Sequence, residues 1–205
     1  MISTLLICLV ASVDGHPAPA RVDLNVQPTA EAAPASSATL ESRPAMVRFG
    51  TEGTRWWTLG TGVGKDLHDS LDVNVHAAFS TFIAQDVEWA IEGALWNIAL
   101  DGDDAQAINA TMIFRWHFYN AEKWSAYVDG GIGLLFSTDD VPNDGTSMNF
   151  TPRVGLGLTR QITDAGTRLQ AGLRWHHISN ARMTGDDNNP SRDGLMLYAG
   201  VMIPF

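Results

Sequence analysis

The sequence predicts an all-β protein: an eight-stranded antiparallel transmembrane β-barrel with a disordered N-terminal segment. Two observations predict this fold. From about residue 54 onward, apolar and polar residues alternate, as they do along a strand whose successive side chains point to opposite faces. The alternating segments are also joined by connections that are long and short in turn, which is typical of an outer-membrane barrel.

The composition excludes several classes of protein. The 205 residues are 45% hydrophobic and 18% charged, with 13 basic and 23 acidic residues and a net charge of −10. This balance argues against a nucleic-acid partner, because binding phosphates requires clustered lysine and arginine. The single cysteine, Cys8, gives neither an internal disulfide nor a metal-ligand cysteine spacing. We expect no cofactor and assign no metal site. Beyond residue 13 there is no apolar run of the ~20 residues that a membrane helix needs.

The N-terminal residues read as a leader and a tether. Residues 2–13 are an apolar run followed by Ala18-Pro19-Ala20, which predicts a signal peptide over 1–20, although no lysine or arginine precedes the run. A buried N-terminal strand is the alternative interpretation. Residues 21–45 are rich in Ala, Pro, Ser, Glu and Thr, and such a stretch buries too little apolar surface to order itself. We therefore expect a disordered tether, with the barrel spanning 46–205.

Eight segments alternate clearly enough to be strands. In order they are 54–63, 71–79, 86–98, 108–118, 124–136, 148–158, 169–176 and 195–205. The connections at 64–70, 99–106, 137–147 and 178–193 are long and rich in Asp, Asn and Gly, whereas those at 83–86, 119–123 and 162–166 are short.

In the first four segments the apolar face is aliphatic and aromatic. It comprises Trp57, Leu59 and Val63; Leu71, Val73, Val75, Ala77 and Phe79; Val87, Trp89, Ile91 and Leu95; and Ile108, Ala110, Met112, Phe114, Trp116 and Phe118. In the last four it comprises Ala126, Val128, Ile132, Leu134 and Phe136; Met148, Phe150, Val154, Leu156 and Leu158; Leu169, Ala171, Leu173 and Trp175; and Leu195, Leu197, Ala199, Val201, Ile203 and Phe205.

The opposite face decides whether the barrel is soluble or membrane-embedded. It holds both signs of charge in similar number, namely Asp72, Glu88, Glu92 and Asp129 against Arg115, Arg153, Arg168 and Arg174. Paired charges suit a narrow, packed interior, where an isolated charge is costly. The chain also ends in Phe205 with apolar residues at alternate positions, which is typical of barrels assembled into outer membranes. We therefore expect the apolar face to meet lipid, and a soluble lipocalin-like barrel that binds an apolar ligand is the alternative.

A histidine and a serine stand together at the end of the seventh strand. His177 and Ser179 are two residues apart, so their side chains share a face, and counting from Trp175 it is the apolar one. An imidazole beside a hydroxyl is the minimal arrangement for activating a serine nucleophile. The other interpretation is that the strand has left the membrane here and both side chains simply meet lipid headgroups. His76, His117 and His176 have inward parity and are expected to form interior hydrogen bonds.

At these residues the chain resembles the lipid A 3-O-deacylases of Gram-negative outer membranes. The resemblance lies in His177, Ser179, Asn180 and Ala181, in the following loop with Pro190 and Gly194, and upstream in 130–133 and 149–158. It covers roughly 125–205. It implies an eight-stranded outer-membrane barrel that hydrolyses the 3-O-linked acyl ester of lipid A (lipopolysaccharide) at a lipid-facing site. Ser179 would be the nucleophile, His177 the general base, and Asn180 part of the oxyanion hole.

The chain departs from the family at the residue that orients the histidine. The family places a glutamate near the start of the last strand, where this sequence has Leu195 and Met196. Asp193 has the same parity as Leu195 and is the nearest substitute, while Asp186 and Asp187 are poorer candidates. The departure keeps open a second interpretation, a non-catalytic structural or adhesive barrel, in which His177 and Ser179 would lie too far apart for a hydrogen bond.

The long connections contain clusters of aspartate. These are Asp101, Asp103 and Asp104; Asp139 and Asp140; and Asp186 and Asp187. Solvated loop charge is the simplest interpretation, and divalent cations bridging these carboxylates to lipid A phosphates are an alternative. The sequence does not predict an oligomeric state.

Overall fold

The computed structural model describes residues 47–66, 70–121, 123–183, 185 and 189–205. The predicted signal peptide and the whole predicted tether, 21–45, lie outside the described residues, as do Asp186 and Asp187. Within the described ranges, no helix is long and apolar enough to cross a membrane.

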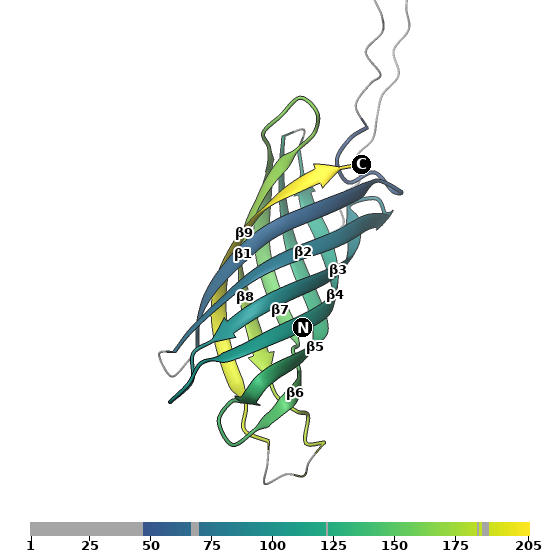
Figure 1. The fold of residues 1–205 in the computed structure, drawn as a ribbon. Coiled ribbons are helices and arrows are strands. Elements are labelled where there is room, and N and C mark those ends of the chain that lie inside the picture. Colours follow the sequence, from purple (N-terminus) through teal and green to yellow (C-terminus); the bar gives the residue numbers. More distant parts are fainter. Residues whose placement is uncertain (1–46, 67–69, 122, 184, 186–188) are drawn as a thin grey trace, which may run out of the picture. The chain divides into compact units, whose positions relative to one another are not determined.

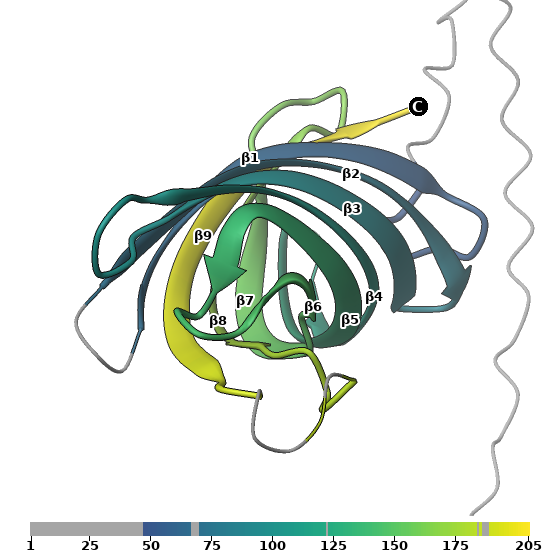
Figure 2. The same ribbon diagram turned by 60° about the horizontal axis from the view of Figure 1, so that its bottom comes forward.

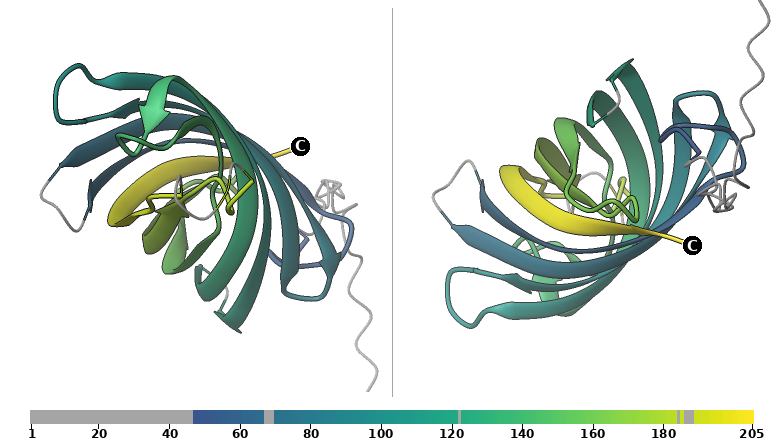
Figure 3. Two further views of the ribbon diagram at one scale, coloured as in Figure 1. Left: turned by 90° about the horizontal axis from the view of Figure 1, so that it is seen from below. Right: turned by 90° about the horizontal axis from the view of Figure 1, so that it is seen from above.

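The described chain is a closed antiparallel barrel (Figure 1). Its strands are β1 (Arg55–Asp66), β2 (Leu71–Ala84), β3 (Val87–Ile98), β4 (Ala105–Asn120), β5 (Trp124–Val141), β6 (Thr146–Phe150), β7 (Arg153–Gln161), β8 (Arg168–Ile178) and β9 (Arg192–Pro204). They follow in the order β4-β3-β2-β1-β9-β8-β7-β5-β6, and a β4–β5 pairing closes the ring. Figures 2 and 3 show the strands wrapping around one interior.

One predicted strand is interrupted. The alternation over 148–158 predicts a single strand, but β6 and β7 are separated by Thr151 and Pro152. Both segments pair with β5: β6 through Leu134↔Phe150, and β7 through Gly131↔Arg153. They are therefore successive parts of one strand of the barrel wall, which we count as one wall element. The ladder breaks at Pro152 because proline has no N–H to donate. The barrel therefore has the eight predicted wall elements.

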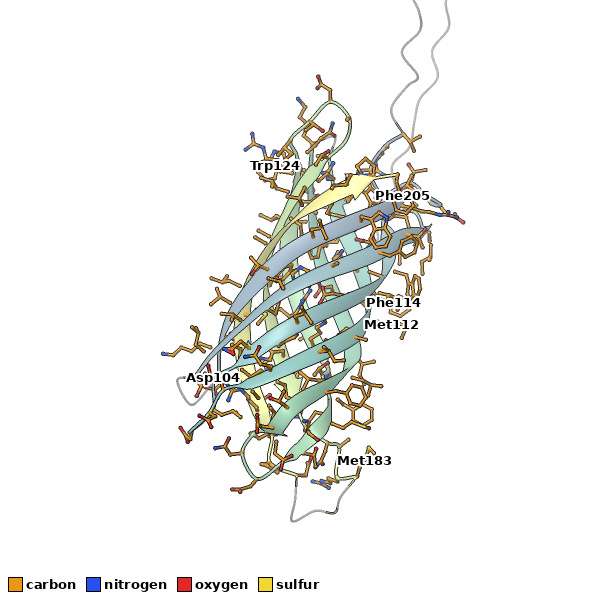
Figure 4. The ribbon with its side chains drawn as sticks, in the orientation of Figure 1. Asp104, Met112, Phe114, Trp124, Met183 and Phe205 are labelled. Carbon is orange, nitrogen blue, oxygen red and sulfur yellow. The ribbon has the colours of Figure 1, made fainter. Side chains whose placement is uncertain are left out.

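The polarity of the barrel is inverted relative to a soluble protein. On β8, Leu173 and Trp175 are 39% and 38% exposed on the outside, whereas Arg174 between them is 3% exposed. Figure 4 shows the same arrangement on β4, where Met112 and Phe114 project from the outer wall. A lipocalin-like barrel would bury Leu173 and Trp175 and expose Arg174. The structure therefore excludes that alternative.

The interior is held by ion pairs between strands. Guanidinium nitrogens lie 2.7 Å from a carboxylate oxygen in both Arg115–Glu88 and Arg153–Glu92, and 2.6 Å in Arg192–Asp72. The hydroxyls of Tyr127 and Tyr198 are 2.7 Å apart across the lumen. A buried charge is tolerated only when it is paired, and these contacts supply the pairing that the charge balance of the inner face predicts.

The two ends of the barrel differ. We call the end that contains the C-terminal Phe205 the proximal end, and the opposite end, where β8 finishes and β9 starts, the distal end (Figure 1). At the proximal end, Phe49 packs edge-on against Trp56, Phe82 and His117, and the Arg168 guanidinium lies 4.0 Å above its ring. The segment before β1 thus fills the proximal mouth of the lumen with an aromatic cluster.

Candidate active site

The candidate site lies at the distal end, where β8 and β9 meet. His177 is the last but one residue of β8 and pairs directly with Asp193, the second residue of β9. Cross-strand partners lie on the same face of a sheet, about 5 Å apart at their β-carbons. The register of the β8–β9 ladder therefore brings an imidazole and a carboxylate together on the outer face of the barrel.

Three polar side chains form a continuous hydrogen-bonded chain there. His177 Nδ1 is 3.0 Å from Asp193 Oδ1, and His177 Nε2 is 2.9 Å from Ser179 Oγ. A carboxylate only accepts hydrogen bonds, so Asp193 selects the tautomer that bears a proton on Nδ1. Nε2 is then an acceptor directed at the serine hydroxyl. The structure thus brings Ser179, His177 and Asp193, the three residues predicted to be catalytic, into one hydrogen-bonded chain.

Ser179 is held just past the end of β8 by a bridge to β6. Its backbone N–H donates to the carbonyl of Phe150, and its carbonyl accepts from the N–H of Phe150, at 3.2 and 2.8 Å. The N–H of His177 donates to the carbonyl of Pro152 at 3.0 Å. The break between β6 and β7 therefore contributes two anchors for the serine and histidine, and the serine itself is 7% exposed.

A tight turn with an uncommon backbone conformation follows the serine. The Met183 N–H donates to the carbonyl of Asn180, and the two central residues, Ala181 and Arg182, have φ of 53° and 63°. Positive φ at both central positions defines a type I′ turn, which glycine and asparagine favour. A β-carbon in this conformation costs roughly 1–2 kcal/mol per residue. A strained turn therefore begins two residues after Ser179.

Asn180 fixes this turn through its side chain. Its Oδ1 accepts from the backbone N–H of Arg182 at 2.9 Å, and the residue is buried. The Nδ2 group at the other end of the same amide carries its two N–H donors. The predicted oxyanion residue is thus adjacent to Ser179 and rigidly placed.

Trp175 completes the surroundings of the imidazole. Its indole stacks on the His177 ring with centroids 5.9 Å apart and an interplanar angle of 30°. The side chains of His177 and Asp193 remain 24% and 30% exposed, so the cluster opens to the outside of the barrel. Sequence reasoning placed Trp175 on the apolar face but gave it no part in the site. The sequence could have indicated it, because residues two apart on a strand lie next to each other on the same face.

The three other histidines among the described residues lie inside the barrel, as their parity predicts. His176 Nε2 is 3.4 Å from Asp72, His117 contacts Ser125 and Glu88, and His76 contacts Asn74. Among the described residues, no three His, Cys, Asp or Glu side chains converge as ligands for a metal ion. The hydrogen-bonded chain of Asp193, His177 and Ser179 is the candidate site on the outer wall.

Comparison with known proteins agrees with this fold. The family model of the lipid A 3-O-deacylases (PagL) matches residues 45–202. The crystal structure of the outer membrane enzyme PagL has a TM-score of 0.53 and 19% identity, covering 72% of this chain and 99% of that one. The crystal structure of Neisserial surface protein A (NspA) has a TM-score of 0.56 and 16% identity, covering 74% and 96%. No curated protein sequence matches the chain.

The match to the family model extends over most of the chain and includes every residue of the hydrogen-bonded chain just described. The fold agrees with it independently, since a closed eight-stranded barrel with an apolar outer wall is also the architecture of the solved outer-membrane barrels. The protein is therefore an outer-membrane β-barrel that belongs to the lipid A 3-O-deacylase (PagL) family.

Proposed function

We propose that this protein hydrolyses the 3-O-linked acyl ester of lipid A on the lipid-facing surface of its barrel. Ser179 acts as nucleophile, His177 as general base and Asp193 as the carboxylate that orients the histidine. The observation that supports this proposal is the unbroken set of contacts from Asp193 through His177 to Ser179, at 3.0 and 2.9 Å. Membership of the family supports lipid A as the substrate.

The first half of the reaction forms an acyl-enzyme. Ser179 Oγ attacks the ester carbonyl carbon while its proton moves to His177 Nε2, and the carbonyl oxygen becomes negatively charged. Asn180 Nδ2 stabilises that oxygen, because a donor fixed in place before the reaction costs no reorganisation when the charge develops. The bond between the acyl carbon and the 3-oxygen of the sugar then breaks, and the proton on Nε2 passes to that oxygen, which leaves as the 3-hydroxyl.

The second half returns the enzyme to its starting state. A water molecule gives its proton to His177 Nε2 as its oxygen attacks the acyl carbon, and collapse of the intermediate restores the Ser179 hydroxyl. The products are a free fatty acid and lipid A with one acyl chain fewer. Throughout both halves, Asp193 holds Nδ1–H and stabilises the imidazolium.

The position of the cluster suits an embedded glycolipid. Leu195 and Leu197 follow Asp193 on the outer face of β9, and Leu173 and Trp175 precede His177 on β8. These residues suit contact with acyl chains in a bilayer, whereas the turn after Ser179 carries the polar Asn180 and Arg182 beside the exposed Met183. The cluster thus lies at the boundary between acyl chains and headgroups, where an ester linkage of a lipid resides.

The alternative of a non-catalytic structural or adhesive barrel predicts that His177 and Ser179 lie beyond hydrogen-bonding distance. Their separation of 2.9 Å does not meet that expectation. The fold shared with surface protein A is compatible with many activities, because a fold by itself does not specify function.

The experiment that tests the proposal compares lipid A from cells that express the wild-type protein, Ser179→Ala or Ser147→Ala. Ser147 is an exposed serine of β6 and provides a matched control. Mass spectrometry should show lipid A shortened by one 3-O-linked chain with wild type and Ser147→Ala, and unaltered lipid A with Ser179→Ala. The amount of folded barrel in the outer membrane should be measured for each variant and should be equal. Unaltered lipid A with wild type, or full activity of Ser179→Ala, contradicts the proposal.

A further inference from the structure

Thr151 lies between the two backbone segments that anchor the candidate site. Phe150 exchanges two backbone hydrogen bonds with Ser179, and the Pro152 carbonyl accepts from the N–H of His177. Thr151 joins Phe150 to Pro152 toward the distal end of the barrel, where β6 ends and β7 begins (Figure 1). The position of Thr151 therefore determines where both anchors lie.

Thr151 is held from inside the barrel. Its backbone N–H donates to the Gly133 carbonyl of β5 at 2.9 Å, and its hydroxyl oxygen accepts from Asn109 Nδ2 of β4 at 2.8 Å. The threonine is buried, whereas the side chain of His177 is open to the outside of the barrel. The side-chain contact that fixes this segment is thus on the opposite side of the wall from the proposed reaction.

Asn109 is itself fixed by two further hydrogen bonds. Its Nδ2 also donates to the Leu134 carbonyl at 3.1 Å, and its Oδ1 accepts from the Thr111 hydroxyl at 2.5 Å. The residue is buried, and its amide has a partner for each of its two N–H donors and for its oxygen. Buried polar groups that are satisfied in this way form a rigid network. Asn109 therefore ties Thr151 to β4 and β5.

Gly133 leaves room for this network. A β-carbon at that position would lie 2.7 Å from the Thr151 hydroxyl oxygen and 2.6 Å from the Ala110 carbonyl oxygen. Both distances are well below the ~3.5 Å at which non-bonded atoms make favourable contact. The contact between Asn109 and Thr151 therefore requires glycine at position 133.

We propose that Asn109 and Thr151 are positioning residues for the proposed hydrolysis. From the lumen side of the wall they fix the segment that holds the backbones of His177 and Ser179. This inference rests on the proposed function. Neither residue touches the reacting atoms, but a displacement of about 1 Å in a reacting group can cost about a hundredfold in rate. Loss of the contact should therefore slow the chemical step and leave substrate binding nearly unchanged.

The first test replaces the hydroxyl of Thr151 and measures KM and kcat on purified lipid A in mixed micelles. Valine has nearly the shape of threonine without the hydroxyl, and Asn109 keeps its bond to Leu134 in this variant. We expect Thr151→Val to lower kcat about ten- to a hundredfold with KM within about twofold of wild type. Thr151→Ser keeps the hydroxyl and should restore most of the lost kcat.

Thr159→Val is the matched control. Thr159 is a buried threonine near the proximal end of β7, and its hydroxyl contacts Ser125 at 2.7 Å and Arg168 Nε at 2.9 Å. Both valine variants remove one hydrogen-bonded hydroxyl from the lumen, so they should lower the free energy of unfolding by similar amounts. Only Thr151→Val should lower kcat, since Thr159 is not next to an anchor of the site.

Asn109→Leu removes the other partner of the contact at a similar side-chain volume. Because the two residues act through one hydrogen bond, the double variant with Thr151→Val should have a kcat no lower than that of the weaker single variant. Losses of kcat that multiply in the double variant would mean that the two residues act independently, and would contradict the proposed link.

Amide hydrogen exchange, followed by NMR in detergent micelles, tests the same link without substrate. In Thr151→Val the amides of Phe150, His177 and Ser179 should exchange about tenfold faster than in wild type, which is the effect of weakening a contact by about one hydrogen bond. The amides of β2, which has no contact with this segment in the strand order, should exchange at the wild-type rate.

Several results would overturn the proposal. An unchanged kcat in Thr151→Val, or an equal loss in Thr159→Val, would show that the contact has no particular effect on the site. A raised KM at constant kcat would assign Thr151 to substrate binding, and wild-type exchange at Ser179 would show that Thr151 does not hold the serine. If wild type leaves lipid A unaltered, the proposed function fails, and the exchange rates then decide separately whether Thr151 fixes Ser179.

Discussion

His177 and Asp193 are direct partners across the β8–β9 ladder, and this register sets the 3.0 Å contact between Nδ1 and Oδ1. A shift of one residue would move Asp193 to the opposite face of the sheet. The contact therefore depends on the whole ladder rather than on the loop between the strands. It also explains how a chain with leucine and methionine at 195 and 196 can still hold the imidazole.

Asp193→Asn should reduce kcat by about 10⁴, the loss found when the carboxylate of a serine-hydrolase triad becomes an amide. The amide can donate to Nδ1 and so stabilise the wrong tautomer of His177. The measurement is single-turnover deacylation of lipid A, with Asp103→Asn, an exposed loop carboxylate, as the control. Activity of Asp193→Asn within tenfold of wild type would mean that another group orients the histidine.

The sequence predicts much of this arrangement because the period of a strand is a local property. Alternation alone gives the eight wall elements, their outer faces and the shared face of His177 and Ser179. It also gives Asp193 the correct parity. It does not give the register between β8 and β9. The connection at 178–193 is long, and nothing in its sequence specifies which residues of the two strands pair.

Two other features of the site depend on contacts between distant segments. The break at Pro152 is visible in the sequence, but its use as an anchor for His177 and Ser179 requires β6 and β8 to be adjacent. The type I′ turn is hidden because Ala181 and Arg182 replace the glycine and asparagine that normally mark one.

Glu92→Gln should destabilise the barrel by about 3–5 kcal/mol, the usual loss when one partner of a buried ion pair is removed. Glu92 Oε1 is 2.7 Å from Arg153 and 3.9 Å from Arg174, so neutralising it leaves two buried guanidinium groups without this counter-charge. Urea-induced unfolding in lipid vesicles measures the difference. Asp103→Asn again provides the control. A loss below about 1 kcal/mol would indicate that interior water replaces the carboxylate.

Asp86→Asn should make the stability of the barrel less sensitive to acid. Partial burial opposes ionisation of Asp86, which lies in the proximal β2–β3 turn. Hydrogen bonds from Asn120 and from the Arg48 guanidinium outweigh it and hold the pKa of this carboxyl below its usual range. A depressed folded-state pKa means that the carboxylate stabilises the protein above about pH 4, and that this contribution is lost as the pH falls through the folded value.

The free energy of unfolding, measured at pH 6 and at pH 3, tests whether the contribution of Asp86 to stability is lost in acid. Wild type should exceed Asp86→Asn in stability at pH 6, and the difference should shrink at pH 3. Asp144→Asn is the matched control, because Asp144 is exposed and has a similar φ, 66° against 61° for Asp86. A difference that grows toward pH 3 would show that the contacts of Asp86 raise its pKa instead.

Trp175→Leu should lower kcat about two- to thirtyfold while leaving KM near its wild-type value. The indole stacks on the His177 ring at a centroid distance of 5.9 Å, and His177 becomes a cation when it accepts the serine proton. An aromatic face stabilises a cation by about 0.5–2 kcal/mol, which corresponds to that range of rates. Because the charge exists only after proton transfer, the stabilisation belongs to the transition state and not to the bound substrate.

Trp175→Phe distinguishes stabilisation of the imidazolium from a purely apolar contact. Trp116→Leu distinguishes it from a general effect of removing a tryptophan from the outer wall. Phenylalanine keeps an aromatic face and should restore part of the lost kcat, whereas a purely apolar function would be served equally by leucine. Trp116 is another tryptophan of the outer wall, 56% exposed on β4, and its replacement should leave both constants unchanged. If Trp175→Leu instead raises KM at constant kcat, the indole contacts the acyl chain of the substrate. The stack on His177 would then contribute nothing to turnover, since an interaction equally strong before and during the chemical step affects binding alone.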